Sequence, residues 1–276
     1  MKRPNWSVVA AFVVVAGFLL AGFGPLPFDP REPHLEAILM GPGPTHWFGT
    51  DRSGLDVFSV TLAATAEILP IALAGTLVGG VLGVVLGALA ASVLSNGASG
   101  ASGRGEWLLR LLDMMQALPV AVLMIIVVGI GGRGTNVAGV IAALALVNIP
   151  LFAKVTYAQA LSVVHEPYVV AARGYGASRT RIALRHILPG VSGIIASQFS
   201  LSVGNAIIAL AALGFLGIGI APPDPSWGEL IRQGSEEVAS GVWWLLVFPT
   251  ATICALVLAL NALARRLSNS KGIAHA

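Results

Sequence analysis

The residues of this chain that could do chemistry are few and widely separated. His46 stands near Asp51 and Asp56, and imidazole and carboxylate groups can bind a metal ion. Their spacing matches no metal-ligand motif, however, and no further histidine or cysteine completes the set. Ser99, in the tetrapeptide 97–100 (GASG), could act as a nucleophile only beside a base, and all five histidines lie outside the apolar segments. We therefore expect no metal site and no catalytic residue, with an intramembrane serine protease as a remote alternative.

The sequence also lacks convincing nucleotide-binding motifs. Residues Gly129 to Gly134 fit the spacing Gly-x-Gly-x-x-Gly, but they end an apolar segment and open no strand–helix unit, so we expect a tight external turn there. The sequence contains no phosphate-binding Gly-x-x-x-x-Gly-Lys-Ser/Thr motif. We expect that this chain is not an enzyme and binds no cofactor, so its energy must come from a partner subunit or from a gradient.

The elements that would position any site are apolar helices. Of the 276 residues, 56% are hydrophobic and only 11% are charged, against about 25% charged in a soluble domain. The pattern predicts an all-α membrane protein with six transmembrane helices and no affinity for nucleic acid. We expect the helices over residues 7–23, 68–94, 107–131, 135–152, 191–215 and 242–263. The chain then divides into residues 1–67, a first span with an acidic extracytoplasmic segment, and residues 68–276, a core with five spans.

Two of these spans carry side chains with a clear pattern. The span 68–94 has a glycine at every fourth position, and such smooth faces let helix backbones approach in lipid. These glycines predict helix packing, either within the chain or at a moving interface beside a pore: Gly75, Gly79, Gly83 and Gly87. The span 191–215 is the most polar one, and polar side chains at membrane depth usually face the bundle interior or water. Four residues of this span are expected to line a pore: Ser197, Gln198, Ser200 and Asn205. The alternative is that they form hydrogen bonds between helices.

A basic loop over about residues 154–190 joins the fourth and fifth spans. It holds Lys154 and four arginines, the densest positive charge in the chain. Two short helices are expected, at 167–173 and 178–184, because proline often begins a helix and glycine often follows its end. Ile182 and Leu184 stand among the arginines and could press into a partner. From charge alone, such a loop would only anchor the topology.

The order of residues in this loop resembles the "EAA" loop of binding-protein-dependent ABC importer permeases. Ala171-Ala172, Gly176 and the ending Arg185-His186-Ile187-Leu188-Pro189 carry the resemblance. It implies that the loop docks on an ATP-hydrolysing subunit. The residues so implied are Glu166, Tyr168, Ala171, Ala172, Arg173, Gly176, Ala177, Arg181, His186 and Pro189. Val170 stands where the family usually has Glu, so an acidic contact from that position is missing.

Two further segments resemble the dipeptide, oligopeptide and nickel branch of these permeases. One is His46-x-x-Gly49-Thr50-Asp51-x-x-Gly54-x-Asp56, in which Leu55 replaces the usual Arg; the other runs from Phe215-Leu216-Gly217 to Pro225-Ser226-Trp227-Gly228. The resemblance covers about residues 45–263 and implies a permease of the second subunit type, with the ABC type I importer fold. Implied partners are a second homologous permease, two ABC ATPase subunits that bind ATP and magnesium, and an extracytoplasmic substrate-binding protein. The implied cargo is a small peptide, with nickel as the alternative and a simple channel as a remote one.

The distribution of charge predicts the orientation. With six spans, the loops on the side of the termini hold twelve of the 16 lysines and arginines but three of the 13 acidic residues. Because cytoplasmic loops are enriched in Lys and Arg, both termini and the basic loop should face the cytoplasm of a prokaryotic cell, with the spans in its cytoplasmic membrane. Trp243 and Trp244 are expected in the interfacial belt of the lipid bilayer.

Overall fold

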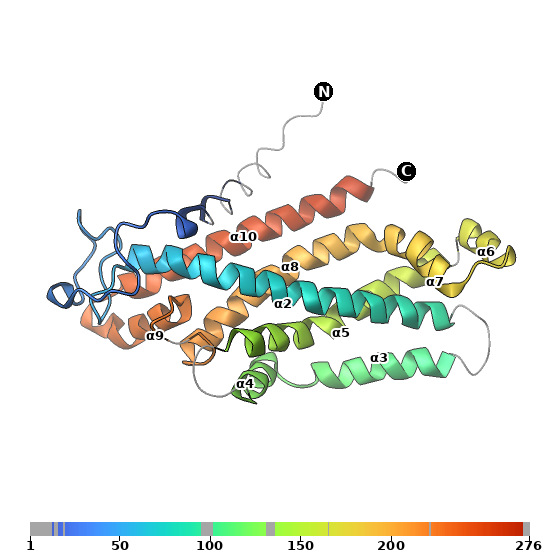
Figure 1. Cartoon of the computed structure of the whole chain (residues 1–276), viewed down its shortest axis with the longest axis horizontal. Helices are drawn as coiled ribbons and strands as arrows, with labels where there is room; N and C mark the ends of the chain where they lie inside the picture. The colour runs from blue at the N-terminus through green and yellow to red at the C-terminus, as the bar shows by residue number, and fades with distance from the viewer. Residues whose placement is uncertain are drawn as a thin grey trace, which may run out of the picture.

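The structure is a computed structural model that describes residues 13, 16–18, 20–94, 102–130, 136–164, 166–220 and 222–272. The regular elements within these ranges are helices, as expected for an all-α protein, and they form an elongated bundle (Figure 1). Their bounds are η1 (Leu35–Ala37), α2 (Val57–Leu94), α3 (Ser102–Gln116), α4 (Val120–Ile130), α5 (Val137–Val164), α6 (Pro167–Gly174), α7 (Arg179–Ile182), the π-helix η2 (Ala183–Ile187), α8 (Leu188–Phe215), α9 (Trp227–Glu237), η3 (Val238–Ser240) and α10 (Trp244–Gly272).

Four of these helices, α2, α5, α8 and α10, are long and apolar enough to cross a membrane. The pair α3 and α4 is bent by 87° and would make a fifth span if it crosses as one broken unit. The break between them contains Pro119, which interrupts the apolar segment expected over 107–131. Most of the expected first span, residues 7–23, lies outside the described residues, so a total of six spans stays a prediction.

The largest boundary difference is the start of α2. The sequence placed the second span from residue 68, whereas α2 begins at Val57. Asp56 accounts for this earlier start, because its Oδ2 accepts hydrogen bonds from the Ser59 backbone N–H (2.9 Å) and the Ser59 hydroxyl (2.8 Å) and so caps the first turn. The division proposed between residues 67 and 68 therefore falls inside a continuous helix.

Helix α9 was not expected, because its segment lies between the spans predicted at 191–215 and 242–263. It begins after Ser226 and carries Glu229 at the third helical position, the spacing of a capping box. Trp227 is fully buried, and its indole N–H donates to the Thr61 carbonyl oxygen at 2.8 Å. This bond fixes the start of α9 against the side of α2.

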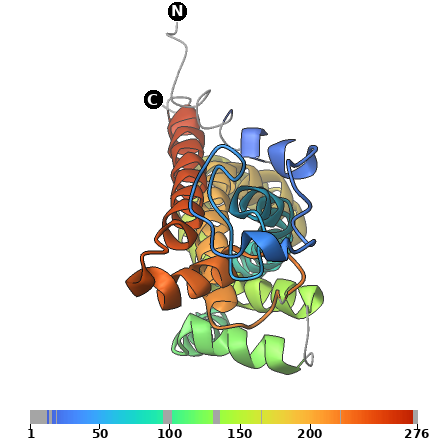
Figure 2. The same ribbon diagram turned by 90° about the vertical axis from the view of Figure 1, so that its left-hand side faces the viewer.

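Side chains of all four long helices meet in one central core. Ile68 of α2, Leu144 of α5, Ile207 of α8 and Leu256 of α10 are each almost fully buried there. The residue 25–56 segment and α9 cover one end of the bundle, and α6 and α7 project at the other (Figure 1). Figure 2 looks along the bundle from the α9 end, with α3 and α4 on one side and α10 on the other.

Candidate coupling loop and transmembrane cavity

The basic loop folds as a compact helical hairpin. α6 ends at Gly174, and Gly176 has a backbone φ of +80°, a left-handed conformation that favours glycine. The Ala177 N–H donates to the Ala172 carbonyl oxygen across this turn at 3.1 Å. The two short helices lie close to the predicted ranges. The loop itself is shorter than expected, because α5 continues through Pro150 to Val164.

The inner face of the hairpin is apolar and packs on the bundle. Val169 and Ile187 are fully buried and Ile182 nearly so, in a cluster with Ala91 of α2 and Ala160 of α5. The expectation that Ile182 presses into a partner is therefore wrong, since it contacts the helices of its own chain. This cluster ties the hairpin to three long helices, because Val191 of α8 also belongs to it.

The outer face of the hairpin is exposed and carries aromatic and basic groups. Tyr175 is 93% exposed, and Tyr168 and Val170 are about half exposed. A shallow depression of about 310 Å³ lies beside them, lined by Ala172, Tyr175, Ala177, Arg181 and Arg185. Glu166, Ala171, Gly176 and Pro189 are exposed as well, whereas the side chains of Arg173 and His186 lie outside the described part. Tyr175 was not among the residues expected from the sequence, although its position between Ala172 and Gly176–Ala177 places it on the same hairpin.

The four glycines of the α2 stripe face α5 of the same chain. A Cβ atom at Gly79 would lie 2.5 Å from the Ala145 carbonyl oxygen, and one at Gly83 would lie 2.5 Å from that of Ile149. The same holds at both ends of the stripe: a Cβ atom at Gly75 would clash with Leu144, and one at Gly87 would clash with Ala153. The stripe therefore brings two backbones of one chain into direct contact, which is the intramolecular alternative of the prediction.

The polar residues of α8 do not share one surface. Ser197 donates to the Ala264 carbonyl oxygen of α10 at 3.3 Å, and Ser200 donates to the Ala196 carbonyl oxygen within its own helix. Gln198 donates to the Ser202 hydroxyl, also at 3.3 Å. Of the four residues expected to line a pore, only Asn205 borders the cavity described next.

This cavity has a volume of about 460 Å³ and lies between the α3–α4 bend, α5 and α8. Its lining is mostly apolar, with Met115, Leu123 and Leu151 among the contributors. Four neutral polar residues also line it: Gln116, Asn148, Ser202 and Asn205. We refer to it below as the elbow cavity.

The motif at 46–56 builds the opposite end of the bundle. His46 Nδ1 lies 2.9 Å from Asp56 Oδ1, and Asp51 Oδ1 accepts from the backbone N–H groups of Ser53 and Leu55 at 2.8 Å each. Burial raises the pKa of the Asp51 carboxyl. No group of three potential metal ligands occurs among the described residues. These side chains hold the segment in place by hydrogen bonding.

Trp244 joins this segment to α10. Its indole N–H donates to the Thr50 carbonyl oxygen at 3.0 Å, and its ring leaves no room for a side chain at Gly49. Trp244 is buried and does not face the lipid as an interfacial residue would, whereas Trp243 is about half exposed. Leu55 packs into the same cluster, together with Val57 and Leu245.

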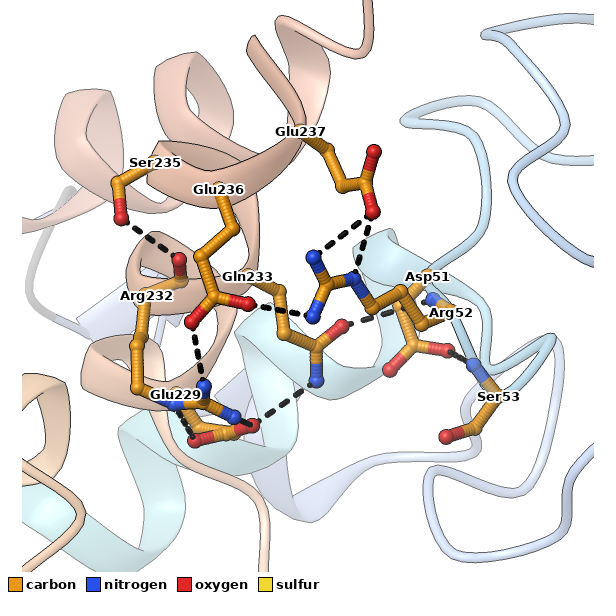
Figure 3. Close-up of polar contacts among 9 residues, drawn as sticks. All are labelled: Asp51, Arg52, Ser53, Glu229, Arg232, Gln233, Ser235, Glu236 and Glu237. Carbon is orange, nitrogen blue, oxygen red and sulfur yellow. Dashed lines mark hydrogen bonds and ion pairs between the residues drawn. The ribbon is translucent and has the colours of Figure 1, made fainter. Parts of the chain in front are cut away.

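A chain of ion pairs then links the segment to α9 (Figure 3). Arg52 Nη1 donates to Glu236 at 2.5 Å and Arg52 Nε donates to Glu237 at 2.9 Å, while Arg232 forms ion pairs with both Glu229 and Glu236. The hydrogen bond from Arg52 lowers the pKa of the Glu236 carboxyl. The 25–56 segment and α9 therefore form one connected cap, which the sequence could not show because it joins residues 184 positions apart.

The sequence is similar to those of several known transport proteins. The chain is 32% identical to the probable D,D-dipeptide transport system permease protein DdpC of Escherichia coli K12, over 95% of this chain and 85% of that protein. It is 31% identical to the dipeptide transport system permease protein DppC of Alkalihalophilus pseudofirmus, over 95% and 83%. It is 33% identical to the glutathione transport system permease protein GsiD of Escherichia coli O1:K1, over 95% and 84%.

The fold has a counterpart of known structure. An inward-facing structure of the MetNI methionine ABC transporter superposes with a TM-score of 0.58 at 17% identity, covering 75% of this chain and 96% of that one. The family model for binding-protein-dependent transport system inner membrane components matches residues 83–269, which include the hairpin, the elbow cavity and both long helices after it. The bundle, its projecting hairpin and the sequence thus agree that this chain belongs to that family, the permease components of ABC importers.

Proposed function

We propose that this chain is the transmembrane permease subunit of an ATP-driven importer that carries small peptides into the cell. The observation that supports this most directly is the set of relatives named for dipeptides and glutathione, each matched over 95% of the chain. ATP and magnesium would bind to separate ATPase subunits, since the chain has no phosphate-binding motif. The proposal therefore gives this subunit a transport role without catalytic residues of its own.

The proposed assembly gives this chain four kinds of partner. A second, homologous permease would complete the translocation path, two ABC ATPase subunits would bind on the cytoplasmic side, and an extracytoplasmic binding protein would deliver the cargo. The lipid bilayer of the cytoplasmic membrane would surround six spans. The excess of basic residues on the hairpin side supports cytoplasmic termini.

The hairpin is proposed as the docking element for an ATPase subunit. Its inner face is anchored by Val169 and Ile187, so an external force on its outer face would reach α2, α5 and α8 directly. Tyr175 and the depression beside Arg181 offer an aromatic and basic surface for that contact. A shift in the ATPases would then bias the permease between states open to opposite sides.

Purification of the tagged chain from its native membrane in mild detergent tests the assembly. We expect a second permease, two ATPases and ATP hydrolysis to accompany it. After reconstitution with the binding protein, the vesicles should take up a radiolabelled di- or tripeptide in an ATP-dependent way. Uptake of nickel instead of peptide would show that the cargo is nickel. Flux without ATP would contradict the proposal that the protein is an ATP-driven importer.

A further inference from the structure

The polar groups of the elbow cavity are neutral amides and hydroxyls. Gln116 comes from the end of α3, Asn148 from α5, and Ser202 and Asn205 from α8, so three elements separated in sequence direct polar residues to one space. Among the residues that the structure describes, no acidic or basic side chain lines the cavity. Such a surface suits a ligand that hydrogen-bonds without carrying charge.

The hydrogen-bonding capacity of this lining is only partly used. The Asn148 Nδ2 group donates to the Leu144 carbonyl oxygen at 2.8 Å, a bond that does not use its side-chain oxygen. Asn205 is exposed and has no hydrogen-bond partner among the described residues. Pro150 has no N–H for the carbonyl oxygen of Leu146, four residues earlier, and both residues line the cavity. Donors and acceptors are therefore both available, as a peptide group requires.

One charged group stands next to the cavity and is already engaged. Lys154 of α5 forms an ion pair with Asp113 and donates to the Gln116 side-chain oxygen, both on α3. Gln116 therefore belongs to both the lining and this contact. A ligand that engages Gln116 would meet a group whose carbonyl oxygen is occupied and whose NH₂ is the available donor.

The chemistry of the lining also discriminates among cargo types. Carboxylate and ammonium ends of a peptide lose much solvation in such a site, with no opposite charge to compensate. A nickel ion prefers nitrogen or sulfur ligands from His or Cys, and neither residue type is found in the described part of the lining. A neutral peptide group flanked by a small apolar side chain fits both the amides and the apolar walls.

We propose that the elbow cavity is a subsite that binds an internal peptide group of the cargo during translocation, through Asn205 and Asn148. This inference rests on the proposed function and adds to it the part of the cargo that is recognised. Because the contacts are made to the backbone of the peptide, the subsite would tolerate different side chains.

Uptake by the complete reconstituted importer tests this subsite. The probes are a labelled tripeptide and the same tripeptide with its internal amide N-methylated, after both have been shown to bind equally to the binding protein. Asn205→Leu keeps the size of the side chain and removes its hydrogen bonds. Asn261→Leu is the matched control, since Asn261 is an amide on α10 outside the cavity lining.

We expect Asn205→Leu to slow uptake of the normal tripeptide by about threefold to tenfold, the effect of one lost hydrogen bond. The methylated tripeptide should be slower in the wild type, and Asn205→Leu should not slow it further. Losses that multiply, or uptake unchanged by the substitution, overturn the subsite while leaving the importer assignment intact. Asn148→Leu repeats the same comparison of the two tripeptides for the second proposed contact, on α5. An importer that assembles with its ATPases but takes up neither peptide overturns the proposed function itself.

Discussion

Adding a methyl group to the glycine stripe should separate α2 from α5. In Gly83→Ala the new Cβ would lie 2.5 Å from the Ile149 carbonyl oxygen and 2.7 Å from Phe152 Cβ. Ordinary contacts are several tenths of an ångström longer, and neither of these atoms can move without the α5 backbone. Overpacking of this kind costs about 1–3 kcal/mol. Part of this cost arises because a gap of ~0.5–1 Å forfeits a quarter to a half of the dispersion energy of each contact.

The neighbouring Gly80 provides the control on the same helix. A Cβ there would meet only the Phe152 ring at 3.4 Å, which is an ordinary contact. Gly80→Ala therefore gains the same helix propensity without the clash. Thermal unfolding of the purified protein in detergent should show a fall of about 2 to 12 °C for Gly83→Ala relative to Gly80→Ala. Equal midpoints for the two variants would refute the backbone contact between α2 and α5.

Three further predictions concern the ends of the bundle. Gly176→Val should impair uptake and coupled ATP hydrolysis, because a β-branched residue is strained at φ +80°, whereas Gly174→Val, with equally open space, should not. Asp51→Asn keeps an oxygen to accept the Ser53 and Leu55 N–H groups but cannot ionise. Burial raises the folded-state pKa of Asp51, so the wild type should lose stability as pH rises above about 3.8. Over that range the unfolding midpoint of Asp51→Asn should rise relative to that of the wild type. Arg52→Gln breaks the contact that lowers the pKa of Glu236, a contribution present above the unfolded pKa and lost as pH falls (Figure 3). Its small effect on the midpoint should therefore shrink at low pH and in about 1 M salt, and a constant difference would contradict the ion-pair account.

Long-range apolar pattern was enough to predict the helical fold and most span positions. The bend at Pro119 was also predictable, since proline interrupts a helix locally. Hydropathy alone does not show the early start of α2, because residues 57–67 are less continuously apolar than 68–94; the spacing of Asp56 and Ser59, typical of an N-cap, is the local signal for it. The same reason explains α9, where Ser226 and Glu229 gave the only local signal.

The hairpin could be predicted from the sequence, whereas the elbow cavity could not. The hairpin depends on local signals, a proline and two glycines, which sequence reasoning can read. The elbow cavity depends instead on the rotation of α8 relative to α5 and on the 87° bend between α3 and α4. Neither angle follows from periodicity alone, so Ser197 and Asn205 could not be separated before the packing was known.

The packing also locates where movement in this subunit would be concentrated. α2 and α5 touch backbone to backbone along the stripe, and the hairpin cluster joins Ala91 of α2 to Ala160 of α5. A displacement of the hairpin should therefore carry α2 and α5 together as one body. The α3–α4 bend is joined to α5 by the exposed Lys154–Asp113 pair, which contributes little, and by the side chains of Met124 and Val128 in the central core. These side-chain contacts can repack more easily than the backbone contact between α2 and α5. The elbow cavity lies between the rigid pair and this bend, so its shape should respond to the hairpin before the helix pair separates. Crosslinking α2 to α5 should then preserve transport, whereas crosslinking α4 to α5 should arrest it.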